Sequence, residues 1–269
     1  MTPIPATSLY QRLAVALMLF VYGSFHGVLA SNKPIALKVY AEPLLELQKQ
    51  VKGEPTGFAV EVVKHIISHS SLQGEVQLLP WARAYERALV QPNTLLFSTR
   101  RTAQREALFI WARPVFAEGF APWYSDTRLI LLCNANFPHK IDNLAQARKF
   151  LLAIPRDDYL EEYARNTLKW PSSRLILTKG FSDIFQMLNK ERVDLALTGE
   201  NELDTLLRRE RLNPIVFKVC FRFNFQESPL YFAFHPDTPR EAIEAFNTAY
   251  DNMIKSGIYH HLYHSWNPL

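Results

Sequence analysis

Apolar and polar positions follow two different patterns that succeed one another from residue 35 to the C-terminus. Residues 58–67 carry apolar side chains at positions 58, 62, 63, 66 and 67, which is the spacing of one buried helix face. Short apolar runs such as residues 151–154 are typical of buried strands. This succession predicts an α/β protein in which helices pack on mostly parallel strands.

The pattern contains two successive units of this kind and a closing segment. The first unit has predicted strands at 37–40, 76–79, 94–97 and 108–111 and helices at 58–67 and 81–89. The second has strands at 128–132, 151–154 and 193–197, and helices capped by Asp142, by Asp157 or Asp158, and by Ser182, with a further helix at 201–211. The closing segment has a strand at 230–234, a helix at 240–256 that ends at Gly257, and a last helix at 258–266.

Residues 1–30 have the features of a secretory signal peptide. Arg12 precedes an apolar run at 13–22, and Val28-Leu29-Ala30 supplies the small residues of a signal peptidase site. We expect cleavage after Ala30 and a periplasmic location. An uncleaved N-terminal anchor is the alternative, because the segment is weakly charged and only Gly23 interrupts its apolar core.

The remaining chain of about 240 residues allows one large domain or two lobes. Its basic residues are scattered, and the formal net charge of the full sequence is only +4, so the sequence does not favour a nucleic-acid partner. Cys133 and Cys220 both lie in apolar, strand-like runs. A disulfide and two buried free thiols are both open, since an exported protein meets an oxidising compartment.

Five segments, read in chain order, resemble the motifs of one family. They are Thr56-Gly57-Phe58-Ala59-Val60-Glu61-Val62-Val63, the segment 97–106 with Ser98, Thr102, Arg105 and Glu106, the helix and strand from Phe181 to Leu197, the segment Ser228-Pro229-Leu230-Tyr231-Phe232-Ala233-Phe234, and the C-terminal segment 257–266. Together they resemble the family 3 periplasmic solute-binding proteins, the amino-acid-binding receptors of ABC-type importers.

The resemblance implies an α/β, two-lobed periplasmic-binding-protein-like fold of type II, with two crossover hinges. Residues 31–120 and 230–269 would form the first lobe and residues 121–229 the second. The hinges would lie near Ala121-Pro122-Trp123 and Gln226-Glu227-Ser228. Hinge closure would bury a solute between the lobes, where strand ends and helix N-termini meet.

Arg105 is the main candidate for ligand binding. Its guanidinium can donate two parallel hydrogen bonds to a carboxylate, and the family has its carboxylate-binding arginine at this point of the motif. Ser98 stands where the family contacts the ligand with a hydroxyl or backbone group. Arg100 replaces a small hydroxyl residue there, and a second cation suits a more anionic ligand or points to solvent.

An aromatic residue and two acids complete this side of the predicted site. Trp81 resembles the position that packs on the ligand's side chain, because a flat ring can stack on a cation or another ring. Glu42 follows the first strand and would pair with an ammonium group. Glu200 falls one residue beyond the family's usual ammonium-binding aspartate.

Pro155-Arg156-Asp157-Asp158-Tyr159 departs most from the family pattern. The family has glycine and small hydroxyl residues here, whose amides hold the ligand carboxylate at a helix N-terminus. Two aspartates stabilise the helix but repel an anion. The solute would then be cationic, or would be recognised through Arg156.

These features predict the binding of a small polar solute, an amino acid or a related compound, for ABC-type uptake. The expected partners are that solute and an inner-membrane permease or sensor, and the protein is expected to be a monomer without enzymatic activity or cofactor. A sensor module that signals through a membrane protein, and a cyclohexadienyl-dehydratase-like enzyme on the same fold, are the alternatives. The histidines at 65, 69, 260, 261 and 264 lack the additional ligands of a metal site.

Overall fold

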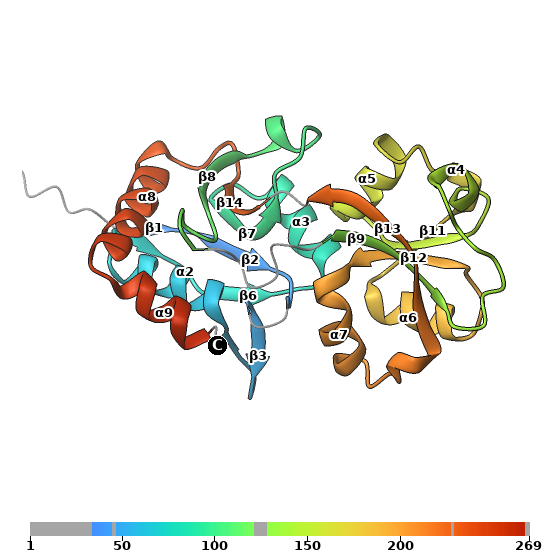
Figure 1. Ribbon diagram of the computed structural model, residues 1–269. Helices are drawn as coiled ribbons and strands as arrows, with labels where there is room; N and C mark the ends of the chain where they lie inside the picture. Colours follow the sequence, from blue (N-terminus) through green and yellow to red (C-terminus); the bar gives the residue numbers. More distant parts are fainter. Residues whose placement is uncertain (1–33, 45–46, 121–127, 227–228, 267–269) are drawn as a thin grey trace, which may run out of the picture. The chain divides into compact units, whose positions relative to one another are not determined.

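The first of two five-stranded sheets combines segments from both ends of the chain (Figure 1). The computed structural model describes residues 34–44, 47–120, 128–226 and 229–266, so the predicted signal peptide lies outside the described residues. The strand order is β6 (Val76–Leu78), β2 (Lys38–Ala41), β7 (Thr94–Arg100), β14 (Leu230–Phe234) and β8 (Ile110–Pro114). All seven residues of β7 are buried, because β7 is the central strand and both faces of the sheet are covered.

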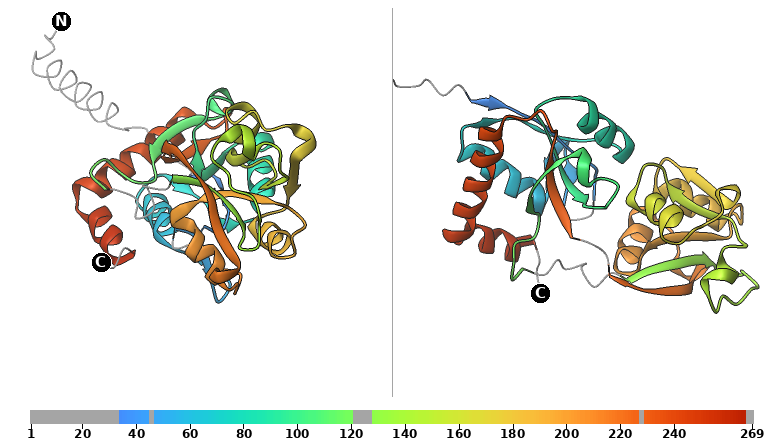
Figure 2. Two further views of the ribbon diagram at one scale, coloured as in Figure 1. Left: turned by 45° about the vertical axis from the view of Figure 1, so that its right-hand side comes forward. Right: turned by 90° about the horizontal axis from the view of Figure 1, so that it is seen from above.

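Helices cover both faces of this sheet, and successive side chains along a strand contact helices on opposite faces. Val39, Leu95 and Phe232 face a core that includes α2 (Phe58–Ser68), α8 (Arg240–Lys255) and α9 (Ile258–Trp266). Their neighbours Tyr40, Leu96 and Ala233 face α3 (Trp81–Val90) instead. The right-hand view of Figure 2 shows α2 and α8 on one side of the sheet and α3 on the other. This two-residue alternation is what a strand with two covered faces requires. We call this sheet and its four helices the first lobe.

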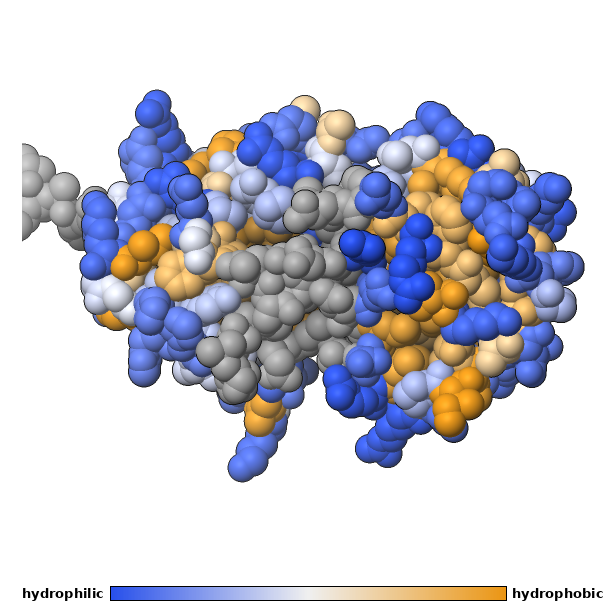
Figure 3. Space-filling model, viewed as in Figure 1, coloured by the Kyte–Doolittle hydropathy of each residue, from blue (hydrophilic) through white to orange (hydrophobic). Residues whose placement is uncertain are grey.

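The second sheet follows the same principle. Its order is β11 (Leu175–Thr178), β10 (Leu152–Pro155), β12 (Leu195–Gly199), β9 (Arg128–Asn134) and β13 (Phe217–Gln226). One face packs on α4 (Leu144–Ala147) and α5 (Tyr159–Asn166), and the other on α6 (Phe181–Asn189) and α7 (Glu200–Arg209). We call this sheet and its helices the second lobe. Apolar surface gathers over this half of the molecule in Figure 3, with polar side chains around it.

The chain crosses between the sheets twice. It leaves the first sheet after β8, builds the whole second sheet, and returns as β14. The predicted two-lobed α/β fold is therefore present. Both predicted hinges, near Ala121-Pro122-Trp123 and Gln226-Glu227-Ser228, involve residues outside the described ranges. No helix within those ranges is long and apolar enough to cross a membrane.

The prediction of mostly parallel strands is confirmed, because four of the five strands in each sheet run in the same direction. In the first sheet β2 is parallel to β6 and β7, whereas β14 is antiparallel to β7 and β8. In the second sheet β10 is parallel to β11 and β12, whereas β9 is antiparallel to β12 and β13. One strand in each sheet makes the antiparallel pairs. It is β14 where the chain returns to the first sheet and β9 where the chain enters the second, and each runs against the other four strands of its sheet.

Several short elements differ from the prediction. Strand β11 was not predicted, and β13 was expected only as the strand-like run around Cys220. The pairs β1 (Ile35–Ala36) with β5 (Leu72–Gln73) and β3 (Lys49–Val51) with β4 (Glu54–Thr56) were not predicted either. Asn143 caps α4 in place of Asp142, and Gly180 precedes α6 in place of Ser182. Short 3-10 turns lie at Glu106–Leu108, Ser172–Arg174 and Pro214–Val216.

A disulfide joins Cys133 of β9 to Cys220 of the neighbouring edge strand β13. Their Cα atoms are 5.9 Å apart, which is an ordinary spacing for a disulfide. Cys220 lies at a register shift of β13, between Val219 and Phe221. The structure thus decides between the two states of the cysteines that the sequence left open.

Candidate functional site

A small cavity lies where the carboxyl ends of parallel strands from both sheets meet. Glu42 follows β2, Trp81 follows β6, Ser98 and Arg100 lie near the end of β7, and Asp158 follows β10. The cavity has a volume of about 50 Å³. Its lining residues are Glu42, Leu44, Trp81, Ser98, Thr99, Arg100, Arg105, Asp158, Tyr159, Leu160, Phe181 and Leu230. Open α/β sheets bind ligands at this edge.

A β-bulge brings Ser98 into the cavity wall. The register of β14 on β7 passes from Tyr231 opposite Thr99 to Phe232 opposite Phe97, which leaves Ser98 as the extra residue. Ser98 has a positive φ of 58°, and its hydroxyl donates to Gln48 Oε1 at 3.0 Å. Gln48 is fully buried, and its Nε2 has no hydrogen-bond partner within the described part of the chain. A non-glycine residue in this region of φ marks local strain, which is often found at binding sites.

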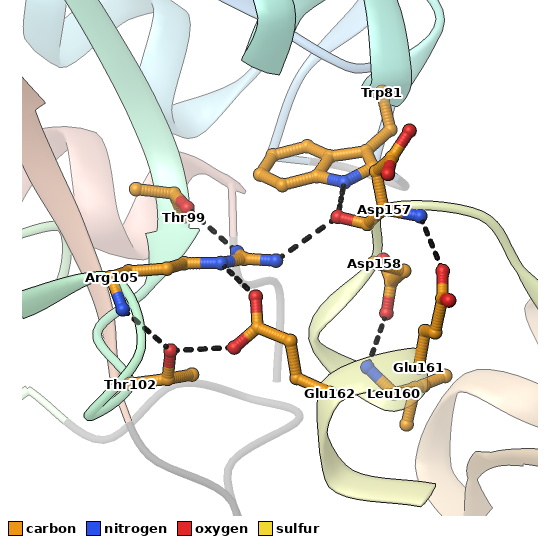
Figure 4. Close-up of polar contacts among 9 residues, drawn as sticks. All are labelled: Trp81, Thr99, Thr102, Arg105, Asp157, Asp158, Leu160, Glu161 and Glu162. Carbon is orange, nitrogen blue, oxygen red and sulfur yellow. Dashed lines mark hydrogen bonds and ion pairs between the residues drawn. The ribbon is translucent and has the colours of Figure 1, made fainter. Parts of the chain in front are cut away.

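The guanidinium of Arg105 is buried between the two lobes, with only 1% of the residue exposed (Figure 4). Nε donates to Glu162 Oε1 at 2.6 Å, Nη2 to the carbonyl of Asp157 at 3.1 Å, and Nη1 to Thr99 Oγ1 at 3.4 Å. The rings of Trp81 and Tyr85 lie 5.1 Å and 4.8 Å from its Cζ. Each guanidinium nitrogen therefore has a partner, and two of the three partners belong to the second lobe.

Burial has an electrostatic consequence for the neighbouring tyrosine. The pKa of Tyr85 is raised, chiefly because burial disfavours the phenolate, although the positive charge of Arg105 works in the opposite direction. Tyr85 therefore remains a neutral ring beside the guanidinium. A neutral aromatic face stabilises a desolvated cation without competing for its hydrogen bonds.

Glu162 uses both carboxylate oxygens to contact the first lobe. Oε1 accepts from Arg105, and Oε2 accepts from the Thr102 hydroxyl at 2.7 Å. The side chain of Glu162 is 22% exposed and belongs to α5 of the second lobe. Its two donors belong to the first lobe. The contact therefore links the lobes directly.

The turn before α5 contributes backbone to this link. Asp157 has a positive φ of 59°, and its carbonyl accepts from both Arg105 Nη2 and Trp81 Nε1, the latter at 2.6 Å. Asp158 is the N-cap of α5 and accepts from Leu160 N at 2.8 Å. The first helical turn is thus capped by acids of its own segment.

A second cation, Arg100, lines the same cavity. Arg100 ends β7 with 7% of the residue exposed, and its Cζ lies 4.7 Å from the ring of Tyr159 in α5. Tyr159 thus gives Arg100 an aromatic partner from the opposite lobe, as Trp81 and Tyr85 do for Arg105 from the first. The cavity wall combines two guanidinium groups, two acids and several aromatic rings.

Solved structures with this architecture share one fold. A histidine kinase sensor domain with similarity to periplasmic binding proteins aligns with a TM-score of 0.71 and 16% identity, over 88% of this chain and 98% of that one. The arginine-, lysine-, histidine-binding protein ArtJ from Geobacillus stearothermophilus aligns with a TM-score of 0.67 and 15% identity, over 86% and 94%. This chain has a periplasmic-binding-protein-like fold.

A third example of this fold is the ancestral amino-acid-binding protein AncCDT-1, a precursor of cyclohexadienyl dehydratase. Its TM-score is 0.62 at 17% identity, with 86% of this chain and 94% of that one covered. No family model matches the sequence, and no curated protein matches it by sequence. The likeness therefore concerns the periplasmic-binding-protein-like fold, and membership of family 3 stays a prediction.

Five of the eight residues that the sequence singled out line the cavity. They are Glu42, Trp81, Ser98, Arg100 and Arg105. Sequence reasoning missed Glu162, Thr99 and Tyr159. The signal available for Glu162 was the cluster of acids at the start of the predicted helix after Asp157, where a carboxylate stabilises the helix N-terminus but says nothing about its distant partner.

The other three predicted residues lie elsewhere. Arg156 and Asp157 line a separate, larger groove of about 1170 Å³ between α3 and α6, although the Asp157 carbonyl reaches Arg105. This groove is open and carries five basic residues, Arg83, Arg156, Lys179, Lys190 and Arg192. Glu200 lies outside both spaces and forms an ion pair of 2.8 Å with Arg222.

The described residues contain no group of three or more His, Cys, Asp or Glu side chains placed to hold a metal ion. His260 and His264 of α9 approach each other through Nε2 atoms 3.1 Å apart, in an exposed position. The cavity itself is lined by charged and hydroxyl side chains, aromatic rings and leucines. A lining of this kind can bury an organic molecule and pair with its polar groups.

Proposed function

We propose that this protein binds a small polar solute, an amino acid or a related compound, between its two lobes. The observation that carries the proposal is the buried guanidinium of Arg105 at the meeting edge of both sheets. Burying a cation costs several kcal/mol unless partners compensate for lost hydration. A cation with a planar set of donors at this place is suited to hold a carboxylate.

Binding requires the lobes to separate and close again. The cavity of about 50 Å³ is far below the roughly 300–1,000 Å³ of typical ligand pockets. Arg105 lines this cavity from the first lobe, and its ion-pair partner Glu162 belongs to the second lobe. Hinge motion of the two lobes would open this space and reseal it around the solute.

The periplasm is the proposed location. The described cysteines form a disulfide, and disulfides form and persist in oxidising compartments such as the periplasm. The predicted signal peptide at residues 1–30 supports the same location. An inner-membrane permease of ABC-type uptake is the proposed partner, and the protein is proposed to act as a monomer.

A sensor role is the second candidate. The histidine kinase sensor domain is covered over 98% of its length at a TM-score of 0.71, so the whole of such a domain has its counterpart here. Deleting the gene discriminates the two roles, because loss of solute uptake indicates transport, whereas loss of a solute-dependent transcriptional response with normal uptake indicates sensing.

No catalytic role is proposed. An elimination enzyme is the alternative, because one of the similar solved structures is a precursor of cyclohexadienyl dehydratase. Incubating the bound solute with the protein and recording its NMR spectrum over hours tests this point. A new product whose amount grows with protein concentration would overturn the proposal of simple binding.

A thermal-shift screen tests the proposed function. The purified protein is titrated with amino acids, polyamines, small carboxylates and short peptides, because a ligand that binds only the folded state raises the unfolding midpoint. We expect a saturable rise with amino acids or related carboxylates. The absence of a saturable rise with every class would contradict solute binding.

A further inference from the structure

The carboxylate of Glu162 occupies the position expected for a solute carboxylate. It accepts from Arg105 Nε at 2.6 Å and from the Thr102 hydroxyl at 2.7 Å. A carboxylate bound through both oxygens to a guanidinium and a hydroxyl has the contacts that an amino acid's carboxylate would use. Figure 4 shows Glu162 reaching from α5 toward Arg105.

Some partners of Arg105 belong to its own lobe and would stay with it if the lobes separated, whereas others belong to the second lobe and would be lost. Thr99, Trp81 and Tyr85 come from the first lobe, as does Arg105 itself. Glu162 and the Asp157 carbonyl come from the second lobe. Separating the lobes would therefore strip Arg105 of its anion and one acceptor together.

We propose that Glu162 is an internal competitor that binds Arg105 in the absence of solute and holds the lobes closed, so that a carboxylate-bearing solute must displace it. This inference rests on the proposed function and names the solute's anchoring group. Glu162 thereby becomes a determinant of affinity.

Competition from a tethered group follows from simple population arithmetic. A solute can bind only the fraction of molecules in which Glu162 has left Arg105, and the apparent dissociation constant rises by the inverse of that fraction. A carboxylate attached to the same chain also has a high effective concentration, on the order of millimolar. Exchanging one carboxylate for another gains little hydrogen-bond energy, because the same donors are used.

The test compares Glu162→Ala with a matched variant. Asp251→Ala also removes a carboxylate from an arginine pair, but its partner Arg113 lies in the same lobe at 2.6 Å. Glu162→Gln serves as a second variant, because a neutral amide keeps the shape and one acceptor while losing the charge. Circular dichroism and thermal melts establish that each variant is folded.

The first readout needs no solute. Small-angle X-ray scattering of the ligand-free proteins should give a larger radius of gyration for Glu162→Ala than for the wild type, an intermediate value for Glu162→Gln, and an unchanged value for Asp251→Ala. Equal radii for folded Glu162→Ala and wild type would overturn the inference, whatever the solute is.

The second readout uses matched probes with and without a carboxylate. Glycine, L-glutamine and L-arginine are titrated beside their carboxamides by thermal shift and calorimetry. Those free amino acids that bind should bind Glu162→Ala at least about tenfold more tightly than the wild type. The carboxamides should bind each protein more weakly than the parent amino acids, because they lack the anion that replaces Glu162 on Arg105. Unchanged or weaker amino-acid binding in Glu162→Ala, compared with a binding wild type, would overturn the competition.

The two readouts separate failure of the inference from failure of the proposed function. In one outcome the wild type is closed, Glu162→Ala is open, and neither protein binds any class of probe. The Glu162 contact would then still hold the lobes together, but the competition with a carboxylate solute and the proposed function would both be rejected. Probe binding with equal affinity in both proteins would retain the proposed function and reject the role of Glu162.

Discussion

The guanidinium of Arg105 contacts both lobes. It donates to Glu162 and the Asp157 carbonyl of one lobe and to Thr99 of the other, and the rings of Trp81 and Tyr85 lie close to its Cζ. A lysine at this position could not make this planar set of bonds, because an ammonium group is a point charge with a different geometry. The properties of the site therefore depend on arginine specifically.

Arg105→Ala should abolish solute-induced stabilisation of the protein. The variant loses the anion-binding group, and it leaves Glu162 without its charged partner, so we expect a loss of about 1–3 kcal/mol in the free energy of unfolding. Thermal-shift titration and urea unfolding measure the two effects. Arg105→Lys is the control. It should retain most of the free energy of unfolding but lose most of the solute affinity, because an ammonium group keeps the charge without the planar set of donors. Full solute binding by Arg105→Ala would contradict the assignment of Arg105 as the anion-binding group.

A disulfide between Cys133 and Cys220 links two strands of the second lobe. The disulfide closes a loop with a sequence separation of 87 residues and attaches the edge strand β13 to β9. Edge strands have hydrogen-bond partners on one side only, which makes them the weakest part of a sheet. The disulfide reinforces the strand that leads back to the first lobe.

Cys220→Ala should destabilise the protein by about 2–5 kcal/mol, because the unfolded chain regains the entropy that a long closed loop removes. Urea unfolding under oxidising conditions measures the difference from the wild type. Adding a thiol reductant should lower the stability of the wild type to that of the variant while leaving the variant unchanged. Equal stability of both proteins without reductant would show that the disulfide contributes nothing.

At the scale of the whole molecule, two buried tyrosines fix the C-terminal helices α8 and α9 to the rest of the first lobe. Tyr259 of α9 donates to the Val115 carbonyl at 2.7 Å and accepts from Ala117 N at 2.9 Å. Tyr250 of α8 donates to the Pro114 carbonyl at 2.8 Å. These bonds attach the last two helices to the segment that leaves the first sheet after β8. The C-terminal helices thus support the point where the chain departs toward the second lobe.

Alkaline pH should weaken this attachment. Burial raises the pKa of Tyr259 to about 12 and also raises the pKa of Tyr250, whereas an unfolded tyrosine titrates near 10. A raised pKa stabilises the folded state fully below pH ~10, and this stabilisation disappears as the pH rises toward about 12. The contribution of Tyr259 is roughly 2–3 kcal/mol.

Tyr259→Phe tests this pH dependence. It should cost about 1–3 kcal/mol near pH 8, because Val115 and Ala117 lose a buried partner. Between pH 9.5 and 12 its free energy of unfolding should fall less than that of the wild type, as measured by urea unfolding at each pH. Parallel decreases in both proteins would mean that Tyr259 does not contribute to the alkaline loss.

Local sequence patterns predict most of the helices and strands and several residues on one side of the site. Periodicity predicted α2, α3, α8 and α9 within one or two residues, because the spacing of apolar side chains is a local property. It ended β7 at Phe97, however, whereas the strand continues through the buried polar residues Thr99 and Arg100. Pairing with β14 maintains those residues in the strand, and that pairing is invisible in the local pattern.

Only the tertiary structure decided which distant residues meet. Glu162 lies 57 residues from Arg105 in the chain, and Cys220 lies 87 residues from Cys133. Likewise Arg156 follows β10 as the motif suggested, yet its side chain lines the larger groove. Local spacing fixes the face on which a side chain lies, whereas the packing of the two lobes fixes what lies opposite it. The pairing of Glu162 with Arg105 therefore could not be predicted from the local sequence pattern and is visible only in the folded structure.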